Sequence, residues 1–279
     1  MPEPTPPHSP DPPGATSSPA HRRIRLGTSG ELARIETDPL GGGYELYIGD
    51  DVQSHVDPTD PTEIRYEYLR RIAHVIDAVT PPGAPLAVLH LGAGALTLPR
   101  YVQATRPGSP QVVVDIDAEL VGFVTSALPL AEGTDLRSVV ADAREAVADL
   151  ADERFDVVVL DVPSDTPGTE HLAGPDFHLE LLDLLTERGV LLVNVGDDDG
   201  LAFLAGQIEA LGEAADAVGL DGCWVLADAG MLDRLALGNA VLAVGSGVAG
   251  MRERLAAAGP HPAAVLEPAE AAALAERAG

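Results

Sequence analysis

Short apolar runs alternate with amphipathic segments from residue 86 onward. The runs are rich in Val, and they are LAVLHL (86–91), QVVVDI (111–116), LRSVV (136–140), FDVVVLD (155–161), VLLVNV (190–195), CWVLA (223–227) and NAVLAV (239–244). Runs that are apolar on both sides and are separated by helical stretches are typical of a parallel sheet covered on both faces. The pattern therefore predicts an α/β fold with a seven-stranded, mostly parallel, Rossmann-like sheet.

The segment before this alternation has a different pattern. Turn signals at GGG (41–43) and GDD (49–51) separate residues of strand type, which are Ile35, Tyr44, Leu46, Ile48 and Val52. This arrangement predicts a small antiparallel β meander over residues 23–60. The next segment spaces apolar residues at helical intervals and ends at Pro81, so it predicts a helix that leads into the main domain, residues 61–250.

The two ends of the chain differ in composition. Residues 1–22 are rich in Pro and Ser and contain too few apolar side chains to offset their ordering entropy, which predicts a disordered tail. Residues 251–279 are rich in Ala, which predicts a helical end piece.

Charge and cysteine usage limit the function classes. The 44 acidic residues outnumber the 17 basic ones, for a net charge of −27, which argues against a nucleic-acid partner and favours a cationic small molecule or solubility alone. One cysteine excludes a disulfide framework, and the expected location is the reducing cytoplasm. No apolar run reaches the ~18 residues that span a bilayer, and the eight histidines show no metal-ligand spacing, so we expect neither a membrane partner nor a metal.

Candidate chemistry lies at the strand ends, because ligands of open parallel sheets bind beyond the carboxyl ends of the strands. The first strand is followed by Gly92 and Gly94, whose backbone can approach a ligand closely. The next three strands end at or beside Asp115, Asp142 and Asp161. A carboxylate about 20 residues after the glycines is a usual acceptor for ribose hydroxyls. The spacing predicts a nucleotide site at this edge.

The order of these motifs resembles the spermidine synthase (polyamine aminopropyltransferase) family over residues 29 to 246. The similar segments are VQS (52–54), YE (66–67), VVVDID (112–117), ADAREAV (141–147), FDVVVLDVPSD (155–165) and GNAVLAVGS (238–246). The resemblance implies the S-adenosylmethionine-dependent, class I methyltransferase-type sheet with an N-terminal β meander. It also implies aminopropyl transfer from decarboxylated S-adenosylmethionine, or a related donor, to a small cationic amine. A homodimer is expected by the same analogy.

The resemblance also implies roles for individual residues. Asp161 would be the general base, and the substrate would contact Gln53, Tyr66 and Asp165. The donor nucleoside would be bound by the glycine bend and by the strand-end residues, which are Gly92, Gly94, Asp115, Asp142 and Ala143.

Two departures from the family pattern leave other functions open. Ala95 stands where the family places the Asp that binds the donor amine, and His90 stands where many methyltransferases place an acid. The loop from Asp161 to its second acid, Asp165, is one residue longer than the corresponding loop of the family. A methyltransferase that uses S-adenosylmethionine itself, and a non-catalytic member of the fold, therefore stay as alternatives.

Overall fold

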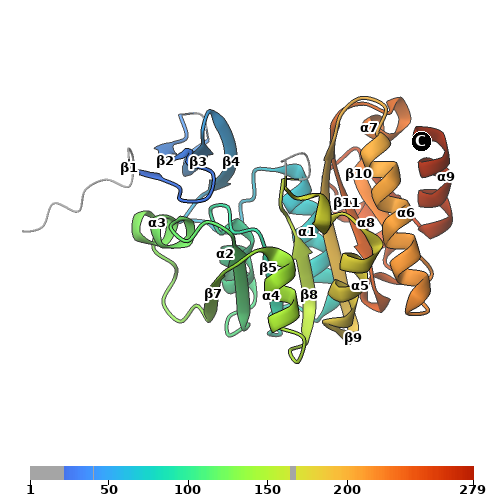
Figure 1. The fold of residues 1–279 in the computed structure, drawn as a ribbon, viewed down its shortest axis with the longest axis horizontal. Helices are drawn as coiled ribbons and strands as arrows, with labels where there is room; N and C mark the ends of the chain where they lie inside the picture. Colours follow the sequence, from blue (N-terminus) through green and yellow to red (C-terminus); the bar gives the residue numbers. More distant parts are fainter. Residues whose placement is uncertain (1–21, 40, 164–167) are drawn as a thin grey trace, which may run out of the picture.

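The computed structural model describes residues 22–39, 41–163 and 168–279, and its elements are shown in Figure 1. Most of the predicted tail, residues 1–21, lies outside the described residues, as does Asp165. Arg22 was assigned to that tail, but it is the first residue of strand β1, where it pairs with Ile35.

An antiparallel sheet of four strands forms the N-terminal region, which confirms the predicted meander. Its strands follow one another in chain order and are β1 (Arg22–Arg25), β2 (Leu32–Thr37), β3 (Tyr44–Ile48) and β4 (Asp51–Val56). Ala33, Ile35 and Leu46 are buried on one face, because successive side chains of a strand alternate between faces. This face packs against residues 93–96 and against α3 (Leu120–Ala127). The small sheet therefore covers the bend that follows the first strand of the main sheet.

The main sheet has eight strands in the order β12-β10-β11-β9-β8-β5-β6-β7. The bounds are β5 (Val88–Leu91), β6 (Gln111–Asp115), β7 (Leu136–Val140), β8 (Phe155–Leu160), β9 (Leu185–Asp197), β10 (Trp224–Asp228), β11 (Gly238–Val244) and β12 (Ala263–Leu266). Strands β7, β6, β5, β8 and β9 pair in parallel, whereas β11 is antiparallel to both of its neighbours. The predicted mostly parallel, Rossmann-like α/β fold is confirmed.

The expected strand number of seven is wrong by one. The eighth strand, β12, lies within residues 251–279, which were expected to be helical, between α8 (Arg252–Ala258) and α9 (Pro268–Ala278). Its sequence is AAVL, and only Val265 is buried. Two alanines favour helix over strand, so local pattern does not reveal the pairing with β10 that fixes this segment.

Helices cover both faces of the main sheet (Figure 1). On one face lie α1 (Glu67–Val79), α2 (Thr97–Thr105) and α8. On the other face lie α4 (Ala143–Asp149), α5 (Pro175–Asp183), α6 (Ala202–Ala217) and α9. Alternate residues of the strands serve the two cores, as in β8, where Val157 and Val159 face α1 and Val158 and Leu160 face the other layer. The shorter α7 (Ala229–Arg234) follows β10, and 3-10 turns occur at Glu170–Leu172 and Ser246–Val248.

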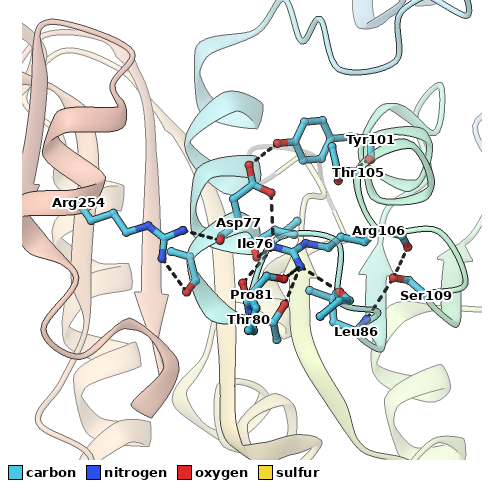
Figure 2. A network of polar contacts seen from close by, with 12 residues as sticks. Ile76, Asp77, Thr80, Pro81, Leu86, Tyr101, Thr105, Arg106, Ser109 and Arg254 are labelled. Atoms are coloured by element: carbon cyan, nitrogen blue, oxygen red, sulfur yellow. Dashed lines mark hydrogen bonds and ion pairs between the residues drawn. The ribbon is translucent and has the colours of Figure 1, made fainter.

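A buried arginine fixes the connection between α1 and β5 (Figure 2). The guanidinium of Arg106 donates to Thr80 Oγ1 at 2.7 Å and to the carbonyls of Pro81 and Ala84 at 2.9 and 3.0 Å. It also lies 3.6 Å from a carboxylate oxygen of Asp77. Because Arg106 is 1% exposed, these acceptors compensate the desolvation of its charge and hold the loop that enters the central strand.

Candidate functional site

The bend after β5 is shaped by two glycines that contact other parts of the protein. Gly92 has a φ of +102°, and a side chain there would collide with the backbone carbonyl of Asp161. Gly94 has a φ of +47°, and a Cβ there would lie 2.5 Å from Ser54 Oγ. That same hydroxyl accepts a hydrogen bond from the Ala95 amide at 3.1 Å. The glycines are therefore required for the packing of β8 and β4 against the bend.

Asp115 ties the end of β6 to this bend. Its Oδ2 accepts from the Ala93 amide at 3.0 Å, and its Oδ1 accepts from the Asp117 amide at 2.9 Å. Burial raises the pKa of Asp115, and the two backbone hydrogen bonds oppose the rise. Each carboxylate oxygen has a second lone pair, so the side chain can still accept from a ribose hydroxyl.

Asp142 follows β7 and caps helix α4. Its Oδ1 accepts from the Arg144 amide at 2.9 Å, and its Oδ2 lies 2.9 Å from His171 Nε2. Ala143 is the buried first residue of the helix. The sequence gives no signal for this pairing, because His171 lies 29 residues after Asp142.

Asp161 follows β8 and is bound by two side chains that the sequence did not single out. Asn194 of β9 donates to its Oδ1 at 2.9 Å, and the Tyr68 hydroxyl of α1 lies at a longer 3.5 Å from its Oδ2. Burial raises the pKa of Asp161, and both hydrogen bonds oppose the rise. The pKa of Tyr68 is raised mainly by burial and also by the charge of Asp161, so its phenol stays protonated.

Asn194 could have been noticed in the sequence. It is the only polar residue in the apolar run VLLVNV, and a polar group in a buried strand needs a partner. Tyr68 carried no such signal, because it fits the apolar spacing of its helix.

A hollow of about 520 Å³ lies beside the two side chains that bind Asp161. It is lined by residues of β4, α1, β9, β11 and the β10–α7 region, including both partners of Asp161, Tyr68 and Asn194. Gln53 and Tyr66, the predicted substrate contacts, lie in the same lining. Within the described part of the chain, its lining includes none of Asp115, Asp142 and Asp161, so Asp161 meets the hollow through Tyr68 and Asn194. Its size is in the range of small-molecule sites.

The sheet order brings the predicted strand-end residues to one edge. The glycine bend, Asp115, Asp142 and Asp161 follow β5, β6, β7 and β8, which are adjacent and parallel. Adjacent strands lie about 4.8 Å apart, so these groups span roughly three strand spacings. Their roles in ligand binding stay predictions.

Residues 22–39, 41–163 and 168–279 contain neither a metal-binding cluster nor a membrane-spanning helix. In these residues no group of three or more His, Cys, Asp or Glu side chains is arranged to hold a metal ion. None of the helices formed by these residues is long and apolar enough to cross a bilayer.

The chain is similar to known proteins in structure only. No family model matches the chain. No curated protein matches it in sequence. A probable spermidine synthase from Corynebacterium glutamicum has a similar structure, with a TM-score of 0.76 and 22% identity over 94% of this chain and 95% of that one. The spermidine synthase from Thermotoga maritima gives a TM-score of 0.51 and 19% identity over 80% and 72% of the two chains.

A third similar structure is a spermidine synthase in complex with the transition state analogue AdoDATO, with a TM-score of 0.51 and 17% identity over 80% of this chain and 72% of that one. These comparisons confirm the predicted fold, because the chain shares the fold of these spermidine synthase structures and has the expected mostly parallel sheet and antiparallel N-terminal meander.

Proposed function

We propose that this protein is a transferase that moves an aminopropyl group from decarboxylated S-adenosylmethionine, or a related donor, to a small amine. The observation that carries the proposal is the position of Asp161. Its backbone packs on the glycine bend, and its carboxylate is held by two residues that line the 520 Å³ hollow. A carboxylate at the junction of a nucleoside site and an acceptor site can take the proton of the amine.

The donor nucleoside would bind along β5, β6 and β7. Asp115 has free acceptor capacity for the ribose, and Asp142 can accept from the amino group of the base. Ile116 and Val140 stand at the ends of β6 and β7 and are 53% and 54% exposed, which offers apolar surface to a flat base. The spermidine synthase bound to AdoDATO shares this fold, which supports a donor of this class.

The proposed step forms one bond and breaks one. The acceptor ammonium loses a proton to the Asp161 carboxylate, and the nitrogen lone pair then attacks the methylene carbon bonded to the sulfonium. The carbon–sulfur bond breaks, and its electron pair goes to sulfur, which becomes the neutral thioether of methylthioadenosine. A raised pKa makes Asp161 a stronger base than an exposed aspartate, which favours its accepting this proton.

A second candidate is methyl transfer from S-adenosylmethionine. It is favoured by the residues at the two positions where a carboxylate for the donor's amine is expected. Ala95 is buried with its amide bonded to Ser54, and no carboxylate stands at that position. His90 is buried and bonded to Gln111 at 3.0 Å, and burial lowers its pKa to about 4, so it is neutral at pH 7. Neither position supplies a negative charge for the donor's amine, and this costs the decarboxylated donor more, because S-adenosylmethionine carries a carboxylate of its own beside its ammonium group.

The test separates these candidates. Pure protein is incubated with decarboxylated S-adenosylmethionine and a panel of amines, and methylthioadenosine is measured. Calorimetry then compares the Kd of the decarboxylated donor with that of S-adenosylmethionine. Release of methylthioadenosine with tighter binding of the decarboxylated donor supports aminopropyl transfer. Tighter binding of S-adenosylmethionine without release supports the methyltransferase, and no binding of either favours a non-catalytic protein.

A further inference from the structure

The charged residues that line the hollow are two acids and two arginines. They are Glu67, Arg71, Asp228 and Arg234. The chain has 44 acidic residues and only 17 basic ones, so composition alone would make an acidic pocket here. An acidic pocket would suit a diamine, which carries two positive charges. The lining instead has as many positive as negative side chains, so it is suited to a ligand that carries an anionic group as well as a cationic one.

Arg71 is a buried cation with weak partners. It is 3% exposed and lies three residues after Tyr68 on α1, so both side chains project from the same face of the helix. Its guanidinium lies 3.4 Å from Glu67 Oε2 and 3.5 Å from the Pro260 carbonyl, both long for charge-assisted hydrogen bonds. Glu67 is itself 52% exposed and is shared with Arg70 at 3.7 Å. Burial lowers the pKa of Arg71, and the charges of Glu67 and Asp228, both in the same lining, oppose this lowering. No hydrogen bond joins Asp228 to Arg71 within the described residues, so the guanidinium retains donor capacity.

Arg234 lies on the α7 side of the same hollow. It is exposed, and within residues 22–39, 41–163 and 168–279 no side chain or carbonyl forms a hydrogen bond or an ion pair with it. Its guanidinium occupies the space beside Gly230, where a Cβ would lie 2.8 Å from Nη2. The missing side chain at Gly230 thus makes room for the guanidinium at the edge of the hollow.

The sheet order assigns these arginines to the acceptor. Asp161 follows β8, with the glycine bend, Asp115 and Asp142 on one side of it. Arg234 follows β10, on the other side of Asp161 and two strand spacings, about 10 Å, beyond the strand of Asn194. A nucleoside on β5, β6 and β7 therefore lies away from Arg234.

We propose that the acceptor carries a carboxylate as well as an amine, with the amine at Asp161 and the carboxylate bound by Arg71 and Arg234. Leu237 and Val52 are 68% and 40% exposed in the lining and would contact the methylene groups between the two ends. The inference rests on the proposed function only in taking the amine as the reacting group.

Matched ligand pairs test this inference by binding. Free lysine and 1,5-diaminopentane differ by one carboxylate, as do ornithine and 1,4-diaminobutane. We expect calorimetry to give a Kd at least tenfold lower for the carboxylate-bearing member of a pair, because a charge-assisted hydrogen bond is worth that factor or more. Equal Kd values, tighter diamine binding, or no binding of either member would overturn the inference.

Variants of Arg234 test whether this residue binds the carboxylate of the acceptor. Arg234→Gln should remove most of the preference, Arg234→Lys should restore part of it, and Arg234→Glu should reverse it in favour of the diamine. Arg188→Gln is the control, because Arg188 is also exposed but lies toward the amino end of β9, away from the hollow. A preference that survives Arg234→Glu would overturn the inference. Turnover of diamines alone would leave the proposed function intact, whereas carboxylate-selective binding without methylthioadenosine release would refute the function alone.

Discussion

The two sides of Asp161 are built in different ways. On the β5–β7 side, the polar groups are bound to nearby backbone, as Asp115 is to the bend and Asp142 is to the start of α4. On the β9–β10 side, the hollow is lined by side chains from separate elements, such as Gln53 of β4, Tyr66 before α1 and Asn239 of β11. Backbone-bound carboxylates are held rigidly in place, whereas exposed side chains such as Arg234 can be exchanged without disturbing a core.

This difference indicates at which residues the substrate specificity can change. A ligand on the β5–β7 side meets groups whose position is set by the sheet itself, so a change of residue there disturbs the fold. In the hollow, a change at an exposed residue such as Arg234 alters what is bound and leaves the sheet intact. We therefore expect substitutions on the β5–β7 side to lower stability and substitutions in the hollow to alter substrate choice.

The largest effect is expected at the junction of the two sides. Asp161→Asn removes the group that would take the proton, so kcat should fall by about 10² to 10⁴ while donor binding persists. Because burial raises the pKa of Asp161, the wild-type kcat should increase with pH through a range above that of an ordinary aspartate. Methylthioadenosine release against pH measures both.

The Tm of the same variant shows whether a loss of activity comes from a loss of folding. The folded protein holds the proton of Asp161 more tightly than the unfolded chain does, so its contribution to the free energy of unfolding falls as pH rises through the raised pKa. At pH 7 the Asn variant should therefore have an equal or higher Tm. The exposed Asp183→Asn is the matched control. Full activity in Asp161→Asn would exclude Asp161 as the base.

A smaller effect is expected on the β5–β7 side. Asp115→Asn replaces a carboxylate that accepts two backbone hydrogen bonds by an amide that can accept at only one atom. We expect a loss of about 1–3 kcal/mol in the free energy of unfolding and a ten- to hundredfold weaker donor Kd. Urea unfolding and calorimetry measure the two quantities. A stable variant with unchanged donor affinity would remove Asp115 from the proposed nucleoside site.

The sequence predicts the β5–β7 side better than the hollow, for a physical reason. In a parallel sheet every strand ends at the same edge, so position along the chain fixes position in space for Asp115, Asp142 and Asp161. The hollow depends on the rotation of α1 about its axis and on the strand order β9-β11-β10, which does not follow the chain. No short motif encodes either property.

The individual residues show the same division. Gln53 and Tyr66 were predicted by a family resemblance and do line the hollow, yet their contact with a substrate stays a prediction. Arg71 and Arg234 have no distinguishing sequence signal, because an arginine in a helix is usually a surface residue. Only the packed structure shows that Arg71 is buried and that Gly230 leaves room for Arg234.

A modest effect is expected from the phenol that faces Asp161. Tyr68→Phe removes the long 3.5 Å hydrogen bond, so kcat should fall about two- to tenfold. That hydrogen bond lowers the pKa of Asp161, so its loss should shift the acid limb of the pH profile upward. Tyr101→Phe is the matched control, because its hydroxyl donates to Asp77 at 2.6 Å, away from the site (Figure 2). An unshifted acid limb would show that Tyr68 does not act on Asp161.

The smallest effect is expected at the pairing of His171 with Asp142. Their atoms lie 2.9 Å apart, but the His171 side chain is 41% exposed, and such exposed pairs contribute under about 1 kcal/mol. His171→Gln can still donate to Asp142, whereas His171→Ala frees one carboxylate oxygen for the base of the donor. We expect little change in Tm for either variant and an equal or slightly lower donor Kd in His171→Ala, because the oxygen no longer has to exchange partners. A donor Kd more than tenfold weaker in His171→Ala, but not in His171→Gln, would show instead that the histidine positions Asp142, and the β5–β7 side would then also depend on contacts between distant segments.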